Sequence, residues 1–238
     1  MSAVLPIYST QAAPAPLAGW LRRVLEPVVA ACRFARAAPV EVRPTGAWSG
    51  WCAGRDEAPD RRIAISQKIC FWTPESLIAV YLHECGHRSL QPFEVADHGP
   101  QFFCLNAILL LRSAAFFRLD PLFKLALYDL QDCPAELETV SNWRGEVLGW
   151  ALPLAAELAA TDESAEALAA QVCESWKSFI RGREQSRAQI AQQALAARKF
   201  AASHKEKNEH LQYSLFVARV FLVASLISLF SVVYFVFF

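Results

Sequence analysis

The segment His83-Glu84-Cys85-Gly86-His87 constrains this chain more than any other feature, because its two histidines are four residues apart. On an α-helix this spacing places both imidazoles on one face, with about 5–6 Å between their Cβ atoms. Two imidazoles so placed can ligate one zinc ion, and Glu84 can reach a water molecule at the metal. The alternative interpretation is a pair of core histidines on an amphipathic helix, without any metal.

Residues before this motif predict where its helix begins. Thr73 suits the N-cap, Pro74 suits the first helical position, and Glu75 suits the positive end of the helix dipole. Apolar residues surround the motif at positions 78–80 and 82, as expected for a helix that enters a core. We therefore expect a helix from residue 74 to about residue 90.

A catalytic zinc site needs a third protein ligand and an open fourth position. We expect His98 to be that ligand, because it lies eleven residues after His87, in a loop that opens a second predicted helix at residues 101–112. The other carboxylates and thiols near the motif leave alternatives open. Glu94 is an alternative third ligand, Asp97 could orient a ligand histidine, Glu136 and Glu138 are late candidates, and Cys85 is expected to pack.

The composition limits the classes of partner and of compartment. Lys+Arg and Asp+Glu both number 23, so the chain has no basic excess, and nucleic-acid binding is not expected. The seven cysteines form no CxxC pair, which excludes a cysteine zinc ribbon. We interpret them as reduced thiols of a cytosolic domain.

The last nineteen residues, 220–238, contain no charged side chain. As a helix they would span about 28 Å, close to the roughly 30 Å hydrocarbon core of a bilayer. Basic residues precede this segment and none follows it, which predicts that the N-terminal domain faces the cytoplasm. We therefore expect a single-pass tail anchor within residues 213–238.

The remaining chain is expected to divide into a flexible start at residues 1–15, a domain at 16–133, and a helical region with a juxtamembrane stalk at 134–212. Residues 39–66 are predicted to be extended. Within them, residues 62–66 resemble an edge strand that could bind a peptide by strand addition. Trp48, Trp51 and Trp72 could line a substrate groove, although core packing is the simpler interpretation.

HExxH followed by a loop and by His-Gly-x-x-Phe at residues 98–102 resembles the SprT-like family of zinc metallopeptidases. The resemblance covers roughly residues 17–112. It implies that His83, His87 and His98 hold one Zn²⁺ per chain and that Glu84 is catalytic, with Gly99 and Phe102 at loop and helix-packing positions. The fold class expected is α+β, a zincin-like domain with a small sheet packed on the HExxH helix, followed by a helical region and one C-terminal transmembrane helix.

The function expected is a membrane-anchored zinc metallopeptidase that cleaves protein or peptide substrates with a zinc-bound water activated by Glu84. One alternative is a zinc-binding module that is anchored to the membrane and does not hydrolyse peptides. Another is a DNA-associated protease, which only the family resemblance suggests.

Overall fold

The computed structural model describes residues 7–8, 15–35, 38, 40–43, 50–52, 63–66, 68, 73–122 and 130–237. The side chains of residues 7–8, 15–16, 50–52, 206 and 220–237 lie outside this description. The chain divides into two compact units, residues 1–180 and residues 181–238.

The first unit contains a small sheet of four strands in the order β1-β2-β4-β3. These strands are β1 Ile7–Tyr8, β2 Val40–Arg43, β3 Gly50–Cys52 and β4 Ile63–Ser66. β2 pairs in parallel with β1 and β4, whereas β3 runs antiparallel to β4. The prediction of an edge strand at residues 62–66 is wrong, because β4 lies between two strands and all four of its residues are buried.

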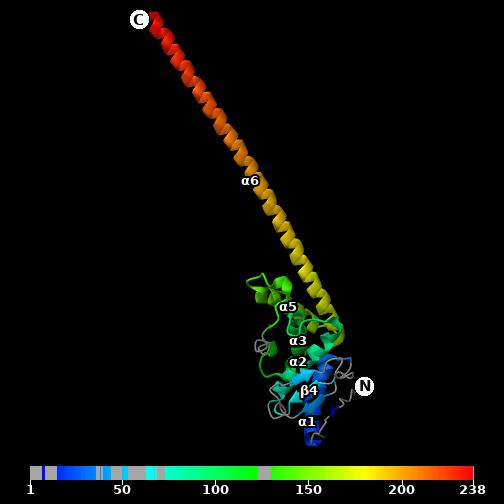
Figure 1. Ribbon diagram of the computed structural model, residues 1–238. Helices are drawn as coiled ribbons and strands as arrows, with labels where there is room; N and C mark the ends of the chain where they lie inside the picture. The colour runs from blue at the N-terminus through cyan, green and yellow to red at the C-terminus, as the bar shows by residue number, and fades with distance from the viewer. Residues whose placement is uncertain are drawn as a thin grey trace. The chain divides into compact units, whose positions relative to one another are not determined.

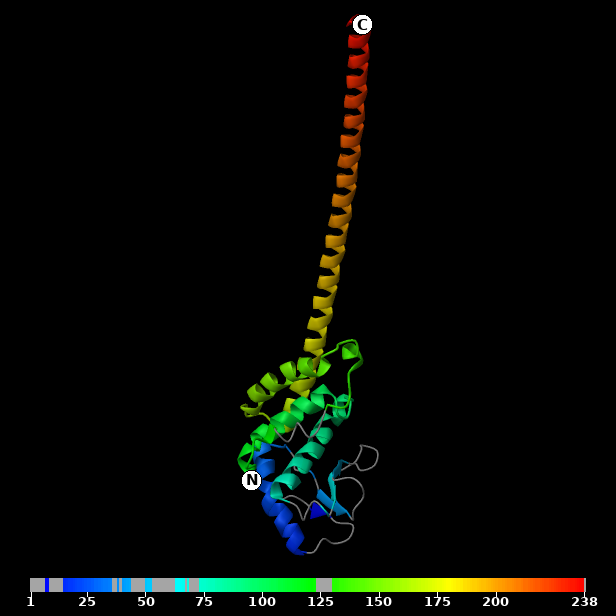
Figure 2. The ribbon, with the colours of Figure 1, turned by 90° about the vertical axis from the view of Figure 1, so that its left-hand side faces the viewer.

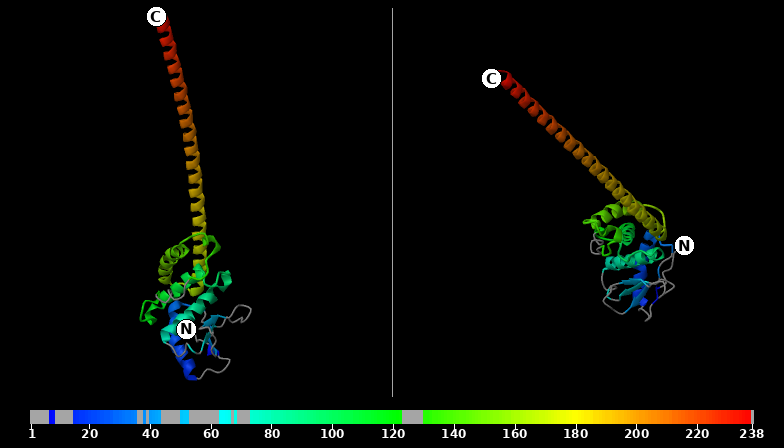
Figure 3. Two further views of the ribbon diagram at one scale, coloured as in Figure 1. Left: turned by 60° about the vertical axis from the view of Figure 1, so that its left-hand side comes forward. Right: turned by 45° about the horizontal axis from the view of Figure 1, so that its top comes forward.

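The other regular elements that the structure describes in the first unit are helices. They are α1 Ala15–Cys32, α2 Pro74–Leu90, η2 Gln91–Phe93, α3 Pro100–Arg112, η3 Ala114–Phe116, η4 Ala135–Leu137, α5 Trp143–Ala159 and the beginning of α6 Ala165–Phe237. α2 contacts β3 and β4 as well as α3, and α3 in turn packs against α5 (Figure 1). Figures 2 and 3 show this succession of strands, α2, α3 and α5 from other sides.

The helix that carries the histidine pair begins where its capping residues predict. The Thr73 hydroxyl accepts a hydrogen bond from the Ser76 backbone N–H at 3.3 Å, and Pro74 is the first helical residue. Most of α2 is buried, with Leu77, Tyr81 and Leu82 fully inaccessible. Burial of a leucine such as Leu77 or Leu82 stabilises the fold by about 1.5–3 kcal/mol, which fixes this helix in the core.

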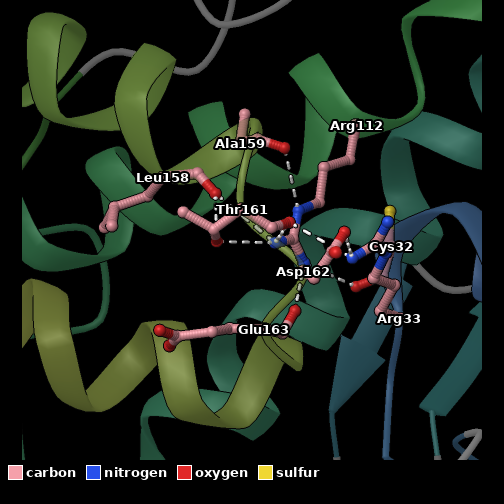
Figure 4. Close-up of polar contacts among 8 residues, drawn as sticks. All are labelled: Cys32, Arg33, Arg112, Leu158, Ala159, Thr161, Asp162 and Glu163. Atoms are coloured by element: carbon pink, nitrogen blue, oxygen red, sulfur yellow. Dashed lines mark hydrogen bonds and ion pairs between the residues drawn. The ribbon is translucent and has the colours of Figure 1, made fainter.

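Arg112, the last residue of α3, joins the carboxyl ends of two other helices (Figure 4). Its guanidinium donates to Thr161 O and Glu163 O at 2.8 Å, and to Cys32 O at 3.2 Å. Longer bonds reach the carbonyls of Leu158 and Ala159 and the Thr161 hydroxyl. Carbonyls at a helix end lack intrahelical partners, so one side chain satisfies the ends of α1 and α5 together.

α1 ends in a left-handed backbone conformation at Arg33, and contacts with residues 162 and 165 stabilise it. Arg33 has a left-handed φ of 55°, and the Phe34 N–H donates to Val29 O at 3.4 Å in the pattern of a Schellman motif. This conformation costs a residue other than glycine about 1–2 kcal/mol. The Arg33 guanidinium forms an ion pair with Asp162, and the backbone carbonyl of Arg33 accepts a hydrogen bond from the Ala165 N–H at 3.3 Å. These contacts connect α1 to the start of α6.

The fold-class prediction, an α+β zincin-like domain, is wrong. The described part of the chain is mostly helical, and its strands have only two to four residues each. The physical reason is that the apolar surface is buried mainly between helices, with α1, α2, α3 and α5 contributing most of the core residues. The small sheet beside α2 covers only one part of that core.

The predicted tail anchor is also corrected. Within the part of the chain that the structure describes, no helix is both long enough and apolar enough to cross a membrane. The side chains at 220–237 and the whole of Phe238, on which the prediction depended, lie outside that part. The predicted placement at a membrane, facing the cytoplasm, loses its basis with the anchor.

The second unit is described by α6 beyond residue 180. Its described side chains up to residue 219 are nearly all exposed, which agrees with the polar composition of residues 181–208. His204 and His210 lie on this exposed helix.

Candidate metal centre

His83, His87 and His98 meet at the carboxyl-terminal half of α2. His83 and His87 lie one turn apart on this helix, and His98 lies in the loop between η2 and α3. The Nε2 atoms of His83 and His87 are 3.2 Å apart, and those of His83 and His98 are 3.4 Å apart. Each residue offers one ring nitrogen, and all three nitrogens lie within 4.8 Å of one another.

These distances suit a tetrahedral metal ion. Two nitrogens bound at 2.0–2.1 Å to one tetrahedral zinc ion lie about 3.3–3.4 Å from each other. The two measured separations, 3.2 and 3.4 Å, lie within about 0.1 Å of that range. Three imidazoles are also a donor set that zinc accepts in catalytic sites, where it keeps a fourth position open. The residues present therefore fit a zinc ion.

The Phe102 ring packs against all three histidines. It stacks on His87 with 4.2 Å between centroids, and it meets His83 and His98 edge-on at 4.8 and 5.2 Å. Phe102 is 4% exposed and lies in the first turn of α3, so its ring covers the imidazoles from the protein interior. This contact limits the rotation of the rings and holds their nitrogens together.

Gly86 explains how that ring can approach α2. A Cβ atom at Gly86 would lie 3.1 Å from Cε2 of Phe102, closer than ordinary carbon contacts allow. The absent side chain lets α3 bring Phe102 against the histidine face of the helix. Sequence reasoning did not assign Gly86 a role, although a glycine inside a helix is a signal of close packing.

The electrostatics of the cluster favour neutral imidazoles. Burial, followed by the charges of His87 and His98, lowers the pKa of His83 to about 3. Burial and the charge of His98 lower the pKa of His87 to about 4. Both rings are therefore neutral at pH 7, and a neutral ring keeps the nitrogen lone pair that a metal requires.

Glu84 is adjacent to the first histidine of the pair and is 6% exposed. Successive residues of an α-helix are rotated by about 100° around its axis. Glu84 therefore lies on the side of α2 adjacent to the face that carries His83 and His87. The prediction that this carboxylate exchanges protons at the centre remains a prediction.

The loop that carries His98 is held from a distant part of the chain. The His98 backbone N–H donates to Oδ2 of Asp132 at 3.0 Å, across 34 residues of sequence. Sequence reasoning had suggested Asp97 as the orienting carboxylate, but Asp97 is exposed. No local pattern marks Asp132, because its partner lies in another segment.

The other candidates from the sequence do not join the cluster. Glu94 lies in a left-handed turn with φ 51° and is exposed, while Cys85 is buried at 1% exposure in the core. Glu136 and Glu138 lie at η4 and just after it, outside the metal-capable group. Trp48 and Trp72 lie outside the described residues, and Trp51 is described only by its backbone.

A pocket of about 310 Å³ lies beside the His98 loop. Its walls are formed by residues 93–96 and 100–101 in and beside that loop, by residues 133, 134 and 136, and by three residues of α6. Glu94 and Glu136 are the acidic side chains of this lining, and Phe93 and Trp176 are its aromatic ones. The pocket and the histidine cluster therefore share one loop.

Comparison of the chain with protein-family models gives no match. Comparisons with curated proteins and with solved structures also give no match.

Proposed function

We propose that this protein is a zinc-dependent peptide hydrolase in which His83, His87 and His98 hold one zinc ion. The single observation that carries the proposal is the spacing of the three ring nitrogens, 3.2 and 3.4 Å along the two measured edges. Glu84, next to His83 on the same buried helix, supplies the carboxylate that hydrolysis requires.

A zinc ion held there supplies Lewis-acid chemistry, because it polarises a peptide carbonyl and lowers the pKa of water. His83 and His87 keep their nitrogen lone pairs available, since burial lowers the pKa of both rings and keeps them neutral. Glu84 takes the proton from the attacking water and passes it to the amide nitrogen that leaves. The net reaction adds one water across the peptide bond and restores the Glu84 carboxylate.

The sheet supports a peptide as the substrate class. β3 is an edge strand of the described sheet, and an extended peptide could pair with such a strand by strand addition. β3 also contacts α2, the helix that carries both the histidine pair and Glu84. A peptide added to β3 would therefore run beside the proposed metal helix.

The resemblance to SprT-like metallopeptidases remains part of this proposal. The arrangement of the His-Gly-x-x-Phe segment supports it, because His98 joins the cluster and Phe102 packs on the three rings. The substrates of that family are not carried over to this chain.

The test is metal content and peptide cleavage by the full chain, with Glu84→Gln and His98→Ala beside it. We expect about one zinc per wild-type chain, retained by Glu84→Gln and weakened in His98→Ala. Cleavage of a mixed peptide library should fall by about 10²- to 10⁴-fold in Glu84→Gln. Undiminished cleavage by Glu84→Gln, or a folded wild type that takes up no metal, would contradict the proposal.

A metal-binding module without hydrolytic activity is the second candidate. The burial of Glu84, at 6% exposure, favours it, because a buried carboxylate can have a structural role without contact with a substrate. This candidate predicts zinc binding with no cleavage of any library peptide by the wild type. The same experiment therefore separates the two functions.

A further inference from the structure

We infer that Asp132 is the positioning residue that brings His98 to the metal, an inference that rests on the proposed function. His98 is the one of the three proposed ligands that no helix holds in position. His83 and His87 are fixed by one helix, whereas residues 95–98 belong to neither helix nor strand. The ring nitrogen of His98 must nevertheless reach 3.4 Å from that of His83.

The hydrogen bond from the His98 N–H to Asp132 Oδ2, at 3.0 Å, ties this loop to the protein at the ligand residue itself. A bond from a backbone N–H to an ionised carboxylate is stronger than a bond between neutral groups. Because it acts on the backbone, it sets the position of the His98 Cα and leaves the ring free to bind.

Asp132 is itself well anchored. Leu130 is 5% exposed and Leu137 is fully buried, so the segment that carries the carboxylate is fixed to the core on both sides. η4 follows directly at Ala135–Leu137. Because its own segment is fixed, the Asp132 carboxylate can hold the His98 loop at a constant distance from α2. A carboxylate on a mobile segment would instead move together with the loop.

The bond also joins two of the three segments that line the pocket beside the cluster. Residues 93–96 and 100–101 lie on the side of His98, and the lining residues 133, 134 and 136 follow Asp132. Loss of the bond should therefore let the His98 loop move away from α2, with an effect on metal affinity larger than that on the metal-free fold.

The experiment measures zinc affinity by chelator competition, and the visible spectrum of bound cobalt(II), for the full-length wild type, Asp132→Ala and Asp132→Asn. We expect Asp132→Ala to bind zinc about 10- to 100-fold more weakly, with a changed cobalt spectrum. Asp132→Asn keeps an oxygen acceptor for the His98 N–H and should recover most of the affinity. Asp120→Ala is the matched control, because it removes another carboxylate that accepts a backbone N–H, that of Leu122 at 2.9 Å.

Metal-free melting temperatures complete the test. If Asp132→Ala lowers only the melting temperature and leaves the zinc affinity and cobalt spectrum unchanged, Asp132 is merely structural and the inference is overturned. If Asp132→Asn binds zinc as weakly as Asp132→Ala, the hydrogen bond is not the cause and the inference is likewise overturned. If the wild type itself binds no metal, the proposed function fails first, which is a different result.

Discussion

Replacement of Arg112 with alanine should lower the free energy of unfolding by about 3 kcal/mol. The guanidinium makes two short bonds of 2.8 Å, to Thr161 O and Glu163 O, and four longer ones of 3.2–3.4 Å. A hydrogen bond to a charged group contributes about 1.5–3 kcal/mol, and partial exposure favours the lower value for each short bond. Water can replace the longer bonds, so we assign them little.

Lysine at position 112 should restore only part of the stability that Arg112→Ala loses. The Nε, Nη1 and Nη2 atoms of Arg112 donate to three different carbonyls, those of Ala159, Cys32 and Thr161, and a single ammonium group cannot reach all of them. We expect Arg112→Lys to recover about 1 kcal/mol of the loss. Arg118→Ala is the control, because Arg118 is 95% exposed and its nearest guanidinium contact with Glu75 is 3.8 Å, so it should change stability by less than about 0.5 kcal/mol.

Urea denaturation followed by tryptophan fluorescence gives these values, since all seven tryptophans lie between residues 20 and 176 and report on the first unit. Zinc affinity should stay within about 3-fold of wild type, because α3 separates Arg112 from the histidines by about 18 Å of helix. A stability change below about 0.5 kcal/mol for Arg112→Ala, or full rescue by lysine, would refute the reasoning.

Further expected outcomes concern the histidine cluster. Gly86→Ala should weaken zinc binding by about 10-fold, because the new methyl group displaces the Phe102 ring. Gly149→Ala, where nothing lies within 4 Å of the new Cβ, should instead stabilise α5 by about 0.5–1 kcal/mol without any change in zinc affinity; equal zinc affinities of the two variants would contradict the packing argument. In metal-free protein, the pKa values of about 3 for His83 and about 4 for His87 lie below the unfolded value of 6.5. The unfolded state therefore binds more protons, and stability should be lost as pH falls from about 6.5 toward 3, by roughly 2–3 kcal/mol per pH unit near pH 5. A flat stability profile between pH 4.5 and 6.5 in urea titrations would argue against buried neutral rings.

Local rules account for the part of the site that could be predicted. The four-residue spacing of His83 and His87 puts their rings on one face wherever a helix forms, and Thr73 and Pro74 determine where this helix begins. His98 could be anticipated as a neighbour because few residues separate it from His87. These inferences depend on helix geometry and short loops, which the sequence carries directly.

Long-range contacts account for the part that could not be predicted. Asp132 meets His98 across 34 residues, and Arg112 meets Cys32 across 80. β4 lies inside the sheet because β2 and β3 pair with it on either side. The four residues of β4 do not by themselves specify these partners. The expectation of an α+β fold failed for the same reason, because short apolar runs do not specify which surfaces they will cover.

The amino-acid sequence by itself determined the residue types of the candidate metal centre and the helix that presents two of them, because helical periodicity and capping act over a few residues. Only the tertiary structure decided that His98 reaches them, that Phe102 lies against Gly86, and that Asp132 holds the loop. Those contacts form between segments that are distant in sequence, and burial of shared apolar surface, which no local pattern encodes, selects them.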